Sequence, residues 1–307
     1  MIINTYLKVL CLFLFLCQLS FGDNCRFLLG NKVAREEIIQ ALGQIPVPEP
    51  TSTYVGATPA FNGKGPATRT GKVGVLNLNG EEMNVEAQTF DVINFDNIMP
   101  DGSKGTRETS PKYIKYTSSA KPPGHLRAIA RAIKEDNGGI VVMHEVIGDT
   151  PEAVRANLDK FSDRYLDGKY TTIATKGNDP YGKNTAVLIR KDLPYRYKVS
   201  SYADYKTGEA IPPYKPTTKV FSRDLMVIEF FSSEMSSDSN VKEVPDLVLV
   251  AEHNKSQRLP DDPVRAALPD ADGKIRRELQ GNVAAAVHLK LQEKYPGVPV
   301  LDLGDRN

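Results

Sequence analysis

From about residue 72 onward the chain alternates short β-rich runs with helical stretches, and this alternation limits the possible folds more than any other feature. The spacing of apolar residues predicts helices at 123–135, 151–162 and 274–294. Intermixed strands and helices indicate an α/β or α+β domain built from packed layers. Runs rich in branched and aromatic residues predict strands at 73–77, 90–94, 139–143, 170–175, 185–190, 224–231, 246–252 and 298–303.

The last predicted helix has the clearest pattern. Pro296 and Gly297 end it, and the apolar run 298–303 then predicts a buried strand. One apolar stripe runs along this helix, formed by residues at a spacing of four: Ile275, Leu279, Val283, Val287 and Leu291.

The composition is that of a globular protein. Of 307 residues, 40% are hydrophobic and 25% are charged, and 39 Lys and Arg balance 38 Asp and Glu to a net charge of +1. This balance excludes a polybasic arm or an acidic tail as the dominant feature. Any attraction to phosphate must therefore come from a local patch.

The N-terminal segment predicts export. Lys8 precedes an apolar run, Val9–Cys17, and small residues follow at Ser20 and Gly22. This is the pattern of a signal peptide, 1–22, and it predicts a secreted or periplasmic protein. The run is shorter than the roughly 20 apolar residues that span a bilayer, so we expect no stable membrane anchor.

Behind the signal peptide we expect two regions. Residues 23–71 form an N-terminal extension with a short helix and a Pro/Gly-rich loop from Pro46 to Gly71, and 72–307 form the main domain. Cys25 is the one cysteine of the mature chain, which indicates a free thiol, a partner outside this sequence, or a partly buried bystander.

Polar residues recur where the predicted strands end. These positions are Asn94, Glu145, His253, Asp305 and Asn307. Loops at the rim of one sheet could bring them together into a single polar site. Oxygen ligands with few histidines and no usable cysteine favour Mg²⁺, Mn²⁺ or Ca²⁺ over zinc.

The order of these motifs resembles the endonuclease/exonuclease/phosphatase superfamily, which includes the deoxyribonuclease-I-like nucleases. The resemblance runs from about Glu86 to Asn307 and is most specific at Gly-Asp-x-Asn, here 304–307. It implies an α+β fold, a layered sandwich of mixed β-sheets flanked by helices. The run 182–191 is similar to the family's central strand, and 221–224 to the turn before the next one.

The resemblance also implies roles for individual residues. Glu145 would be the principal Mg²⁺ ligand, and Asn94 would contact the metal or an adjacent phosphate oxygen. Asp305 would orient or deprotonate the attacking water, and Asn307 would hold the scissile phosphate. His253 would donate a hydrogen bond to the phosphate or protonate the leaving oxygen, a role that suits a side chain titrating near neutral pH.

The substrate implied is a phosphodiester, with DNA or RNA as the leading class and Arg223 and Asn184 as substrate-binding residues. Basic residues interleaved with tyrosines between Lys176 and Lys198 fit a sugar-phosphate backbone, although surface lysines are the simpler interpretation of each one. The family also includes phosphodiesterases of phospholipids and of inositol phosphates. These substrates remain alternatives.

One feature qualifies the resemblance. Relatives continue past Gly-Asp-x-Asn with further strands and an Asp-His pair, so the resemblance implies a chain lacking its C-terminal part and an activity in doubt. A non-catalytic remnant or binding protein is therefore the rival hypothesis. Of the other histidines, His144 is expected to face the core or the opposite side from Glu145. His125 and His288 are expected to be structural.

Overall fold

The computed structural model describes residues 49–60, 77–78, 81–82, 85–87, 123–179, 182–232, 243–255, 267–271 and 273–305. The helices within these ranges are α5 (Pro123–Asp136), α6 (Pro151–Tyr165) and α8 (Lys274–Lys294). The strands are β1 (Ser52–Ala57), β2 (Asn77–Leu78), β3 (Glu81–Glu82), β4 (Val85–Ala87), β5 (Ile140–Ile147), β6 (Tyr170–Ala174), β7 (Lys183–Arg190), β8 (Arg196–Ser201), β9 (Met226–Phe231), β10 (Leu247–His253) and β11 (Val300–Asp305).

Two mixed sheets form the centre of the fold. One has five strands in the order β1-β8-β9-β10-β11, antiparallel except for the parallel pair β10 and β11. The other has four strands in the order β4-β5-β7-β6, antiparallel except for the parallel pair β4 and β5. Strands β2 and β3 form a separate short pair.

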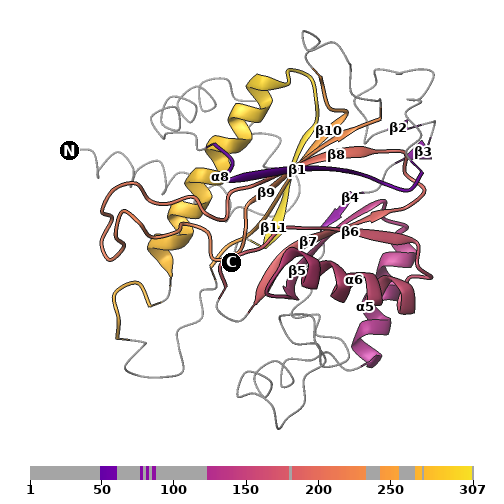
Figure 1. The fold of residues 1–307 in the computed structure, drawn as a ribbon, viewed down its shortest axis with the longest axis horizontal. Coiled ribbons are helices and arrows are strands. Elements are labelled where there is room, and N and C mark those ends of the chain that lie inside the picture. Colours follow the sequence, from indigo (N-terminus) through magenta and orange to yellow (C-terminus); the bar gives the residue numbers. More distant parts are fainter. Residues whose placement is uncertain are drawn as a thin grey trace, which may run out of the picture.

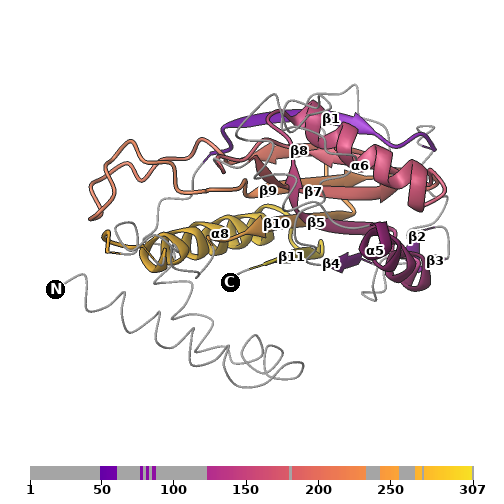
Figure 2. The same ribbon diagram turned by 90° about the horizontal axis from the view of Figure 1, so that it is seen from below.

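The sheets and helices make four layers (Figures 1 and 2). Helices α5 and α6 pack on the outer face of the four-stranded sheet through a core that includes Leu126, Leu158 and Phe161. A second core lies between the two sheets, and a third joins α8 to the outer face of the five-stranded sheet. Every residue of β9 and β10 is buried, as expected for strands that are covered on both faces.

The predicted elements agree closely with the structure. Each of the three predicted helices is present, and six predicted strands correspond to β5, β6, β7, β9, β10 and β11. The N-terminus of α6 follows from local chemistry, because the Thr150 hydroxyl accepts a hydrogen bond from the Ala153 amide at 3.1 Å and Pro151 opens the first turn. The α+β fold class, a layered sandwich of mixed sheets flanked by helices, is confirmed.

The predicted loop Pro46–Gly71 was wrong over β1. This strand pairs antiparallel with β8, itself not predicted, and extends the five-stranded sheet at its edge. Tyr54 packs against the core between the sheets, whereas Val55 is exposed. An edge strand buries only one face, so its apolar signal is weak beside the prolines and glycines that surround it.

The predicted strand 90–94, the predicted signal peptide 1–22 and Cys25 lie outside the described residues. None of the helices in the described part of the chain is both long and apolar enough to cross a membrane.

Candidate functional site

Glu145 lies in a distorted part of β5. The pairing of β5 with β7 shifts register between Met143 and Val146, and Glu145 has a φ of 56°, in the left-handed region. A bulge of this kind re-aims one side chain out of the regular alternation of a strand. Backbone strain of this kind is common at functional sites, so Glu145 is a candidate on structural grounds as well as by motif.

Two cations hold the Glu145 carboxylate. The Lys183 Nζ donates to Oε2 at 2.8 Å, and the Arg223 Nη2 donates to Oε1 at 3.2 Å. The same Arg223 nitrogen lies 3.6 Å from the Asp179 Oδ2, and Nη1 donates to the Asn254 carbonyl at 3.1 Å. The Arg223 side chain is only 6% exposed, so it is a buried cation. The carboxylates of Glu145 on β5 and of Asp179 in the loop after β6 hold it in place.

His253 ends β10 beside this charged group. Its ring meets that of His144 edge to face, with centroids 5.1 Å apart. Burial, and after it the nearby charge of Arg223, lower the pKa of His253 to about 2. Burial likewise lowers the pKa of His144 to about 4. Both imidazoles are therefore neutral at pH 7, which corrects the expectation that His253 titrates near neutrality.

The pairing of β10 with β11 brings Asp305 next to His253. The register aligns Glu252 with Gly304 and His253 with Asp305. A β-carbon at Gly304 would lie 2.0 Å from the Glu252 carbonyl oxygen, so only glycine permits the two backbones to approach this closely. The glycine of the Gly-Asp-x-Asn motif thus sets the place of Asp305 along the sheet.

Asn184 has a different role from the predicted contact with substrate. Its Nδ2 donates to the carbonyls of Val146, Gly148 and Gly182, and its Oδ1 accepts from the Gly177 amide at 2.8 Å. The side chain is buried, and both its polar groups bind backbone. In this geometry Asn184 ties the end of β5 to the loop after β6, and it supports the site without reaching a ligand.

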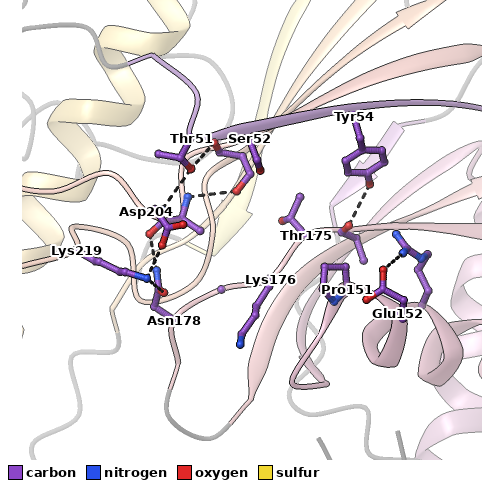
Figure 3. Close-up of a pocket in the computed structure, with 15 residues that line it drawn as sticks. Thr51, Ser52, Tyr54, Pro151, Glu152, Thr175, Lys176, Asn178, Asp204 and Lys219 are labelled. Atoms are coloured by element: carbon purple, nitrogen blue, oxygen red, sulfur yellow. Dashed lines mark hydrogen bonds and ion pairs between the residues drawn. The ribbon is translucent and has the colours of Figure 1, made fainter. Parts of the chain in front are cut away.

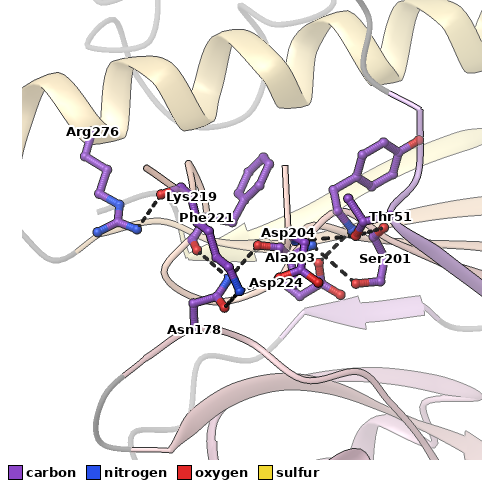
Figure 4. Close-up of polar contacts among 10 residues, drawn as sticks. Thr51, Asn178, Ser201, Ala203, Asp204, Lys219, Phe221, Asp224 and Arg276 are labelled. Carbon is purple, nitrogen blue, oxygen red and sulfur yellow. Dashed lines mark hydrogen bonds and ion pairs between the residues drawn. The ribbon is translucent and has the colours of Figure 1, made fainter. Parts of the chain in front are cut away.

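Glu145, Asp179, Lys183 and Arg223 form a charged cluster. A cavity of about 660 Å³ has a lining of its own (Figure 3). Its lining comes from β1, from the end of β8, from the loop after β6 and from the first turn of α6. Asn178, in the loop after β6, connects this loop to the segment 203–221, because its side chain donates to the Ala203 and Phe221 carbonyls. Its side chain also accepts a hydrogen bond from Lys219 at 3.0 Å (Figure 4). The cavity and the cluster are separate sites that share the segment 176–179.

The described residues do not fit a divalent metal ion as they stand. Both oxygens of Glu145 already bind cations, and nowhere in the described ranges do three or more His, Cys, Asp or Glu side chains group as metal ligands. Asn94, the other predicted ligand, lies outside the described residues, as does Asn307. For Asp305 the structure describes the backbone alone.

The structure brings together Glu145, Arg223 and His253, with the backbone of Asp305 beside them. The sequence analysis missed Lys183 and Asp179 at this site. Both lie inside segments that were singled out for other reasons, but an ion pair across more than 35 positions leaves no local pattern. His144 is fully buried, as expected for a residue that faces the core, and its ring lies against that of His253.

Comparisons with known proteins give fold-level similarities only. No protein-family model matches the sequence, and no curated protein matches it. Among solved structures, truncated Caenorhabditis elegans TDP2 has a TM-score of 0.36 and 18% identity, over 60% of this chain and 55% of that one. A second C. elegans TDP2 structure is similar over 42% of its length, at the same TM-score and identity.

A conserved protein of unknown function from Enterococcus faecalis V583 has a TM-score of 0.33 and 13% identity, over 72% of this chain and 66% of that one. The aligned region thus spans about half of the TDP2 chains. At TM-scores below 0.5 these similarities carry no functional conclusion, and the geometry of the site must supply it.

Proposed function

We propose that this chain belongs to the endonuclease/exonuclease/phosphatase superfamily and hydrolyses phosphodiesters, with nucleic acid as the leading substrate. The observation that carries the proposal is that residues far apart in the sequence meet in the fold. Glu145, Arg223, His253 and the backbone of Asp305 come from four separate motifs and meet at one end of the two sheets. A chance scatter of strand-end polar residues would not produce this meeting.

Arg223 and Lys183 are the groups that would bind the phosphate. A guanidinium offers paired donors that match phosphate oxygens, and an ammonium adds a compact charge. Glu145, Asp179 and the Asn254 carbonyl hold Arg223 in a single orientation before any ligand arrives. Donors fixed in advance need no reorganisation when charge develops on the phosphate, and this is a main source of catalytic rate.

His253 would act as a neutral imidazole. With a pKa of about 2 it carries one N–H donor and one acceptor nitrogen at pH 7, so it can donate a hydrogen bond to a phosphate oxygen or accept a proton. Donation of a proton to the leaving oxygen would first require the histidine to be charged. A bound phosphate would favour that charged form by opposing the effect of Arg223.

A divalent ion, with Mg²⁺ as first candidate, remains a prediction that the described residues do not support in their present arrangement. We assign no step of the reaction to it. Calorimetric titration of Mg²⁺ into the full chain tests the prediction directly. If Lys183 competes for Glu145, the Lys183→Met variant will bind Mg²⁺ more tightly than the unaltered chain, and Glu145→Gln will not bind it. Equal binding by all three would contradict an ion at Glu145.

Hydrolysis assays test the proposed function. Single-stranded DNA, duplex DNA and RNA are offered to the full chain with and without Mg²⁺, Mn²⁺ and Ca²⁺. Arg223→Gln and His253→Ala are expected to lose roughly 10²–10³-fold in turnover, as for the loss of one transition-state donor. The matched controls are Arg190→Gln, whose guanidinium pairs with Asp192 on the surface, and His288→Ala, whose ring contacts Gln292 on α8. Similar losses in site and control variants would show that the site is misplaced.

The second candidate function is non-catalytic binding of a phosphodiester. The full engagement of Glu145 by two cations favours it, because a carboxylate neutralised in this way is a poor metal ligand. Binding of the same oligonucleotides without cleavage under any of the metals would support this candidate, and metal-dependent cleavage would refute it.

Export is also part of the proposal, supported by the apolar run Val9–Cys17 and the small residues Ser20 and Gly22. N-terminal sequencing of the exported protein should begin at or near Asp23. A cytoplasmic product that retains Met1 would contradict it.

A further inference from the structure

The cavity of about 660 Å³ shares a wall with the charged cluster. That wall is the segment 176–179, whose two ends serve the two sites: Lys176 lines the cavity, and Asp179 pairs with Arg223. Between them, Gly177 lies so close to Arg223 that an added β-carbon would be 2.8 Å from its Cα. The Gly177 amide is also bound to Asn184. A ligand in the cavity would therefore lie next to a phosphate held by Arg223.

The polar groups that line the cavity suit a sugar-phosphate unit. The residues that line it include Thr51, Ser52, Thr175, Ser201 and Asn178, of which Thr51 and Asn178 also donate to backbone carbonyls. Its charges leave an excess of one cation, because Arg155 pairs with Glu152 and Lys219 pairs with Asp204. Lys176 is exposed, and within the described part of the chain no ion pair or hydrogen bond engages it. Its ammonium is available for a phosphate (Figure 3).

The size of the cavity selects among nucleic acids. A volume of about 660 Å³ falls within the range of roughly 300–1,000 Å³ that small-molecule pockets occupy. Its cube root is about 9 Å, less than the roughly 12 Å width of the major groove alone in duplex DNA. One nucleotide of a flexible strand fits this space, and a base-paired duplex does not.

We propose that this cavity holds the nucleotide adjacent to the scissile phosphodiester of a single-stranded nucleic acid, with Lys176 on its phosphate. The inference rests on the proposed function and adds a subsite and a strand preference to it. Strand β1 completes the site, because Ser52 and Tyr54 share the face of the strand that lines the cavity. The Tyr54 ring is fixed there by its hydroxyl, which donates to the Ala174 carbonyl at 3.0 Å.

Binding, measured apart from cleavage, tests this proposal. Fluorescence anisotropy of a short labelled single strand, and of the matching duplex, is followed across a salt series in chelator-containing buffer with the full chain. Lys176→Ala removes one phosphate contact and should reduce the slope of log K against log salt by about 0.7 for the single strand. It should also weaken single-strand binding about 3–10-fold at low salt.

A second variant fills the cavity without changing its charge. Ser52 is exposed on an edge strand, so Ser52→Phe should fold normally while it places a ring in the cavity, and single-strand binding should fall about tenfold. Lys160→Ala, at an exposed lysine of α6 outside the cavity lining, is the matched control and should bind as the unaltered chain does. Circular dichroism and melting curves verify that each variant is folded.

The outcomes separate the subsite from the proposed function. The subsite is refuted if Lys176→Ala keeps the salt slope of Lys160→Ala, or if duplex binding falls as much as single-strand binding. If Arg223→Gln and His253→Ala lose cleavage while both cavity variants bind normally, the proposed function stands and the subsite fails. If the cavity variants weaken single-strand binding but no substrate is cleaved, the subsite stands and hydrolysis fails.

Discussion

The left-handed backbone at Glu145 can be measured as a free energy by comparing two substitutions at that one position. Glu145→Ala and Glu145→Gly both remove the carboxylate and its contacts with Lys183 and Arg223. They differ in the backbone, because alanine keeps the strain of a φ of 56° and glycine does not. Any difference in stability between the two variants therefore reports the bulge.

The magnitude follows from two opposing effects. A non-glycine residue in the left-handed region costs roughly 1–2 kcal/mol, which glycine would recover. Glycine in a strand loses more conformational entropy on folding, which costs roughly 0.5–1 kcal/mol relative to alanine. We therefore expect Glu145→Gly to be about 0.5–1 kcal/mol more stable than Glu145→Ala.

Urea denaturation of the full chain, followed by circular dichroism, measures this difference. Lys198 on β8 provides the matched control, because its position in a regular strand should make the glycine variant less stable than the alanine variant by about 0.5–1 kcal/mol. The sign of the difference should thus reverse between the two positions. If glycine is less stable than alanine at Glu145 as well, the bulge stores no strain and the reasoning that marks Glu145 as a strained functional residue is refuted.

Three further predictions concern the same end of the sandwich. Gly304→Ala should destabilise the fold by several kcal/mol, because its β-carbon would overlap the Glu252 carbonyl, and hydrogen exchange should show that β11 opens. The control is Gly281→Ala on α8, where nothing lies within 4 Å of the added β-carbon, and it should stabilise the fold by about 0.5–1 kcal/mol. Burial raises the pKa of Asp224 to about 7, so the folded chain binds more protons than the unfolded one between pH 4 and 7. The free energy of unfolding should therefore fall by about 2–3 kcal/mol from pH 5 to pH 8. Asp224→Asn should abolish that fall, and an unchanged pH profile in this variant would contradict the prediction. Nuclear magnetic resonance should find the His253 ring neutral at pH 5, and its pKa should rise in Arg223→Gln; titration near 6.5 in the unaltered chain would contradict the burial argument.

The elements that sequence could predict are those with a strong local pattern. Helix α8 buries Val283, Val287 and Leu291 along one stripe, and the mainly apolar strands β9 and β10 lie in the middle of four layers. Strand β1 could not be predicted, because it buries one face at a sheet edge and is defined by its partner β8, 139 to 149 positions away. The same limit applies to Lys183 and Asp179, which join the site only through pairing across the fold.

The chemistry of His253 was mispredicted for a related reason. Sequence shows a histidine after a strand, where exposure and a pKa near neutrality are the ordinary expectation. Its actual environment depends on three segments: His144 on β5, Arg223 before β9, and the strand β11 alongside. Burial and positive charge lower its pKa together, and neither is visible until those segments pack. The place of His253 at the end of a strand was therefore predictable, whereas its protonation state was not.

Features that disfavour folding are concentrated at one end of this sandwich. A glutamate in left-handed backbone, a buried arginine, two neutral histidines and a glycine-dependent close approach all lie where β5, β10 and β11 meet, whereas the rest of the sheet interior is mainly apolar. A buried ion pair alone would be weak evidence for function, because hydrophobic residues of similar size often serve stability as well or better. An ion pair between Glu145 and Arg223 would not, however, require a strained bulge on β5 or a histidine pair beside it. Several departures from local rules meet at this place, and such a meeting is expected where a chain gives up stability to hold a reactive arrangement.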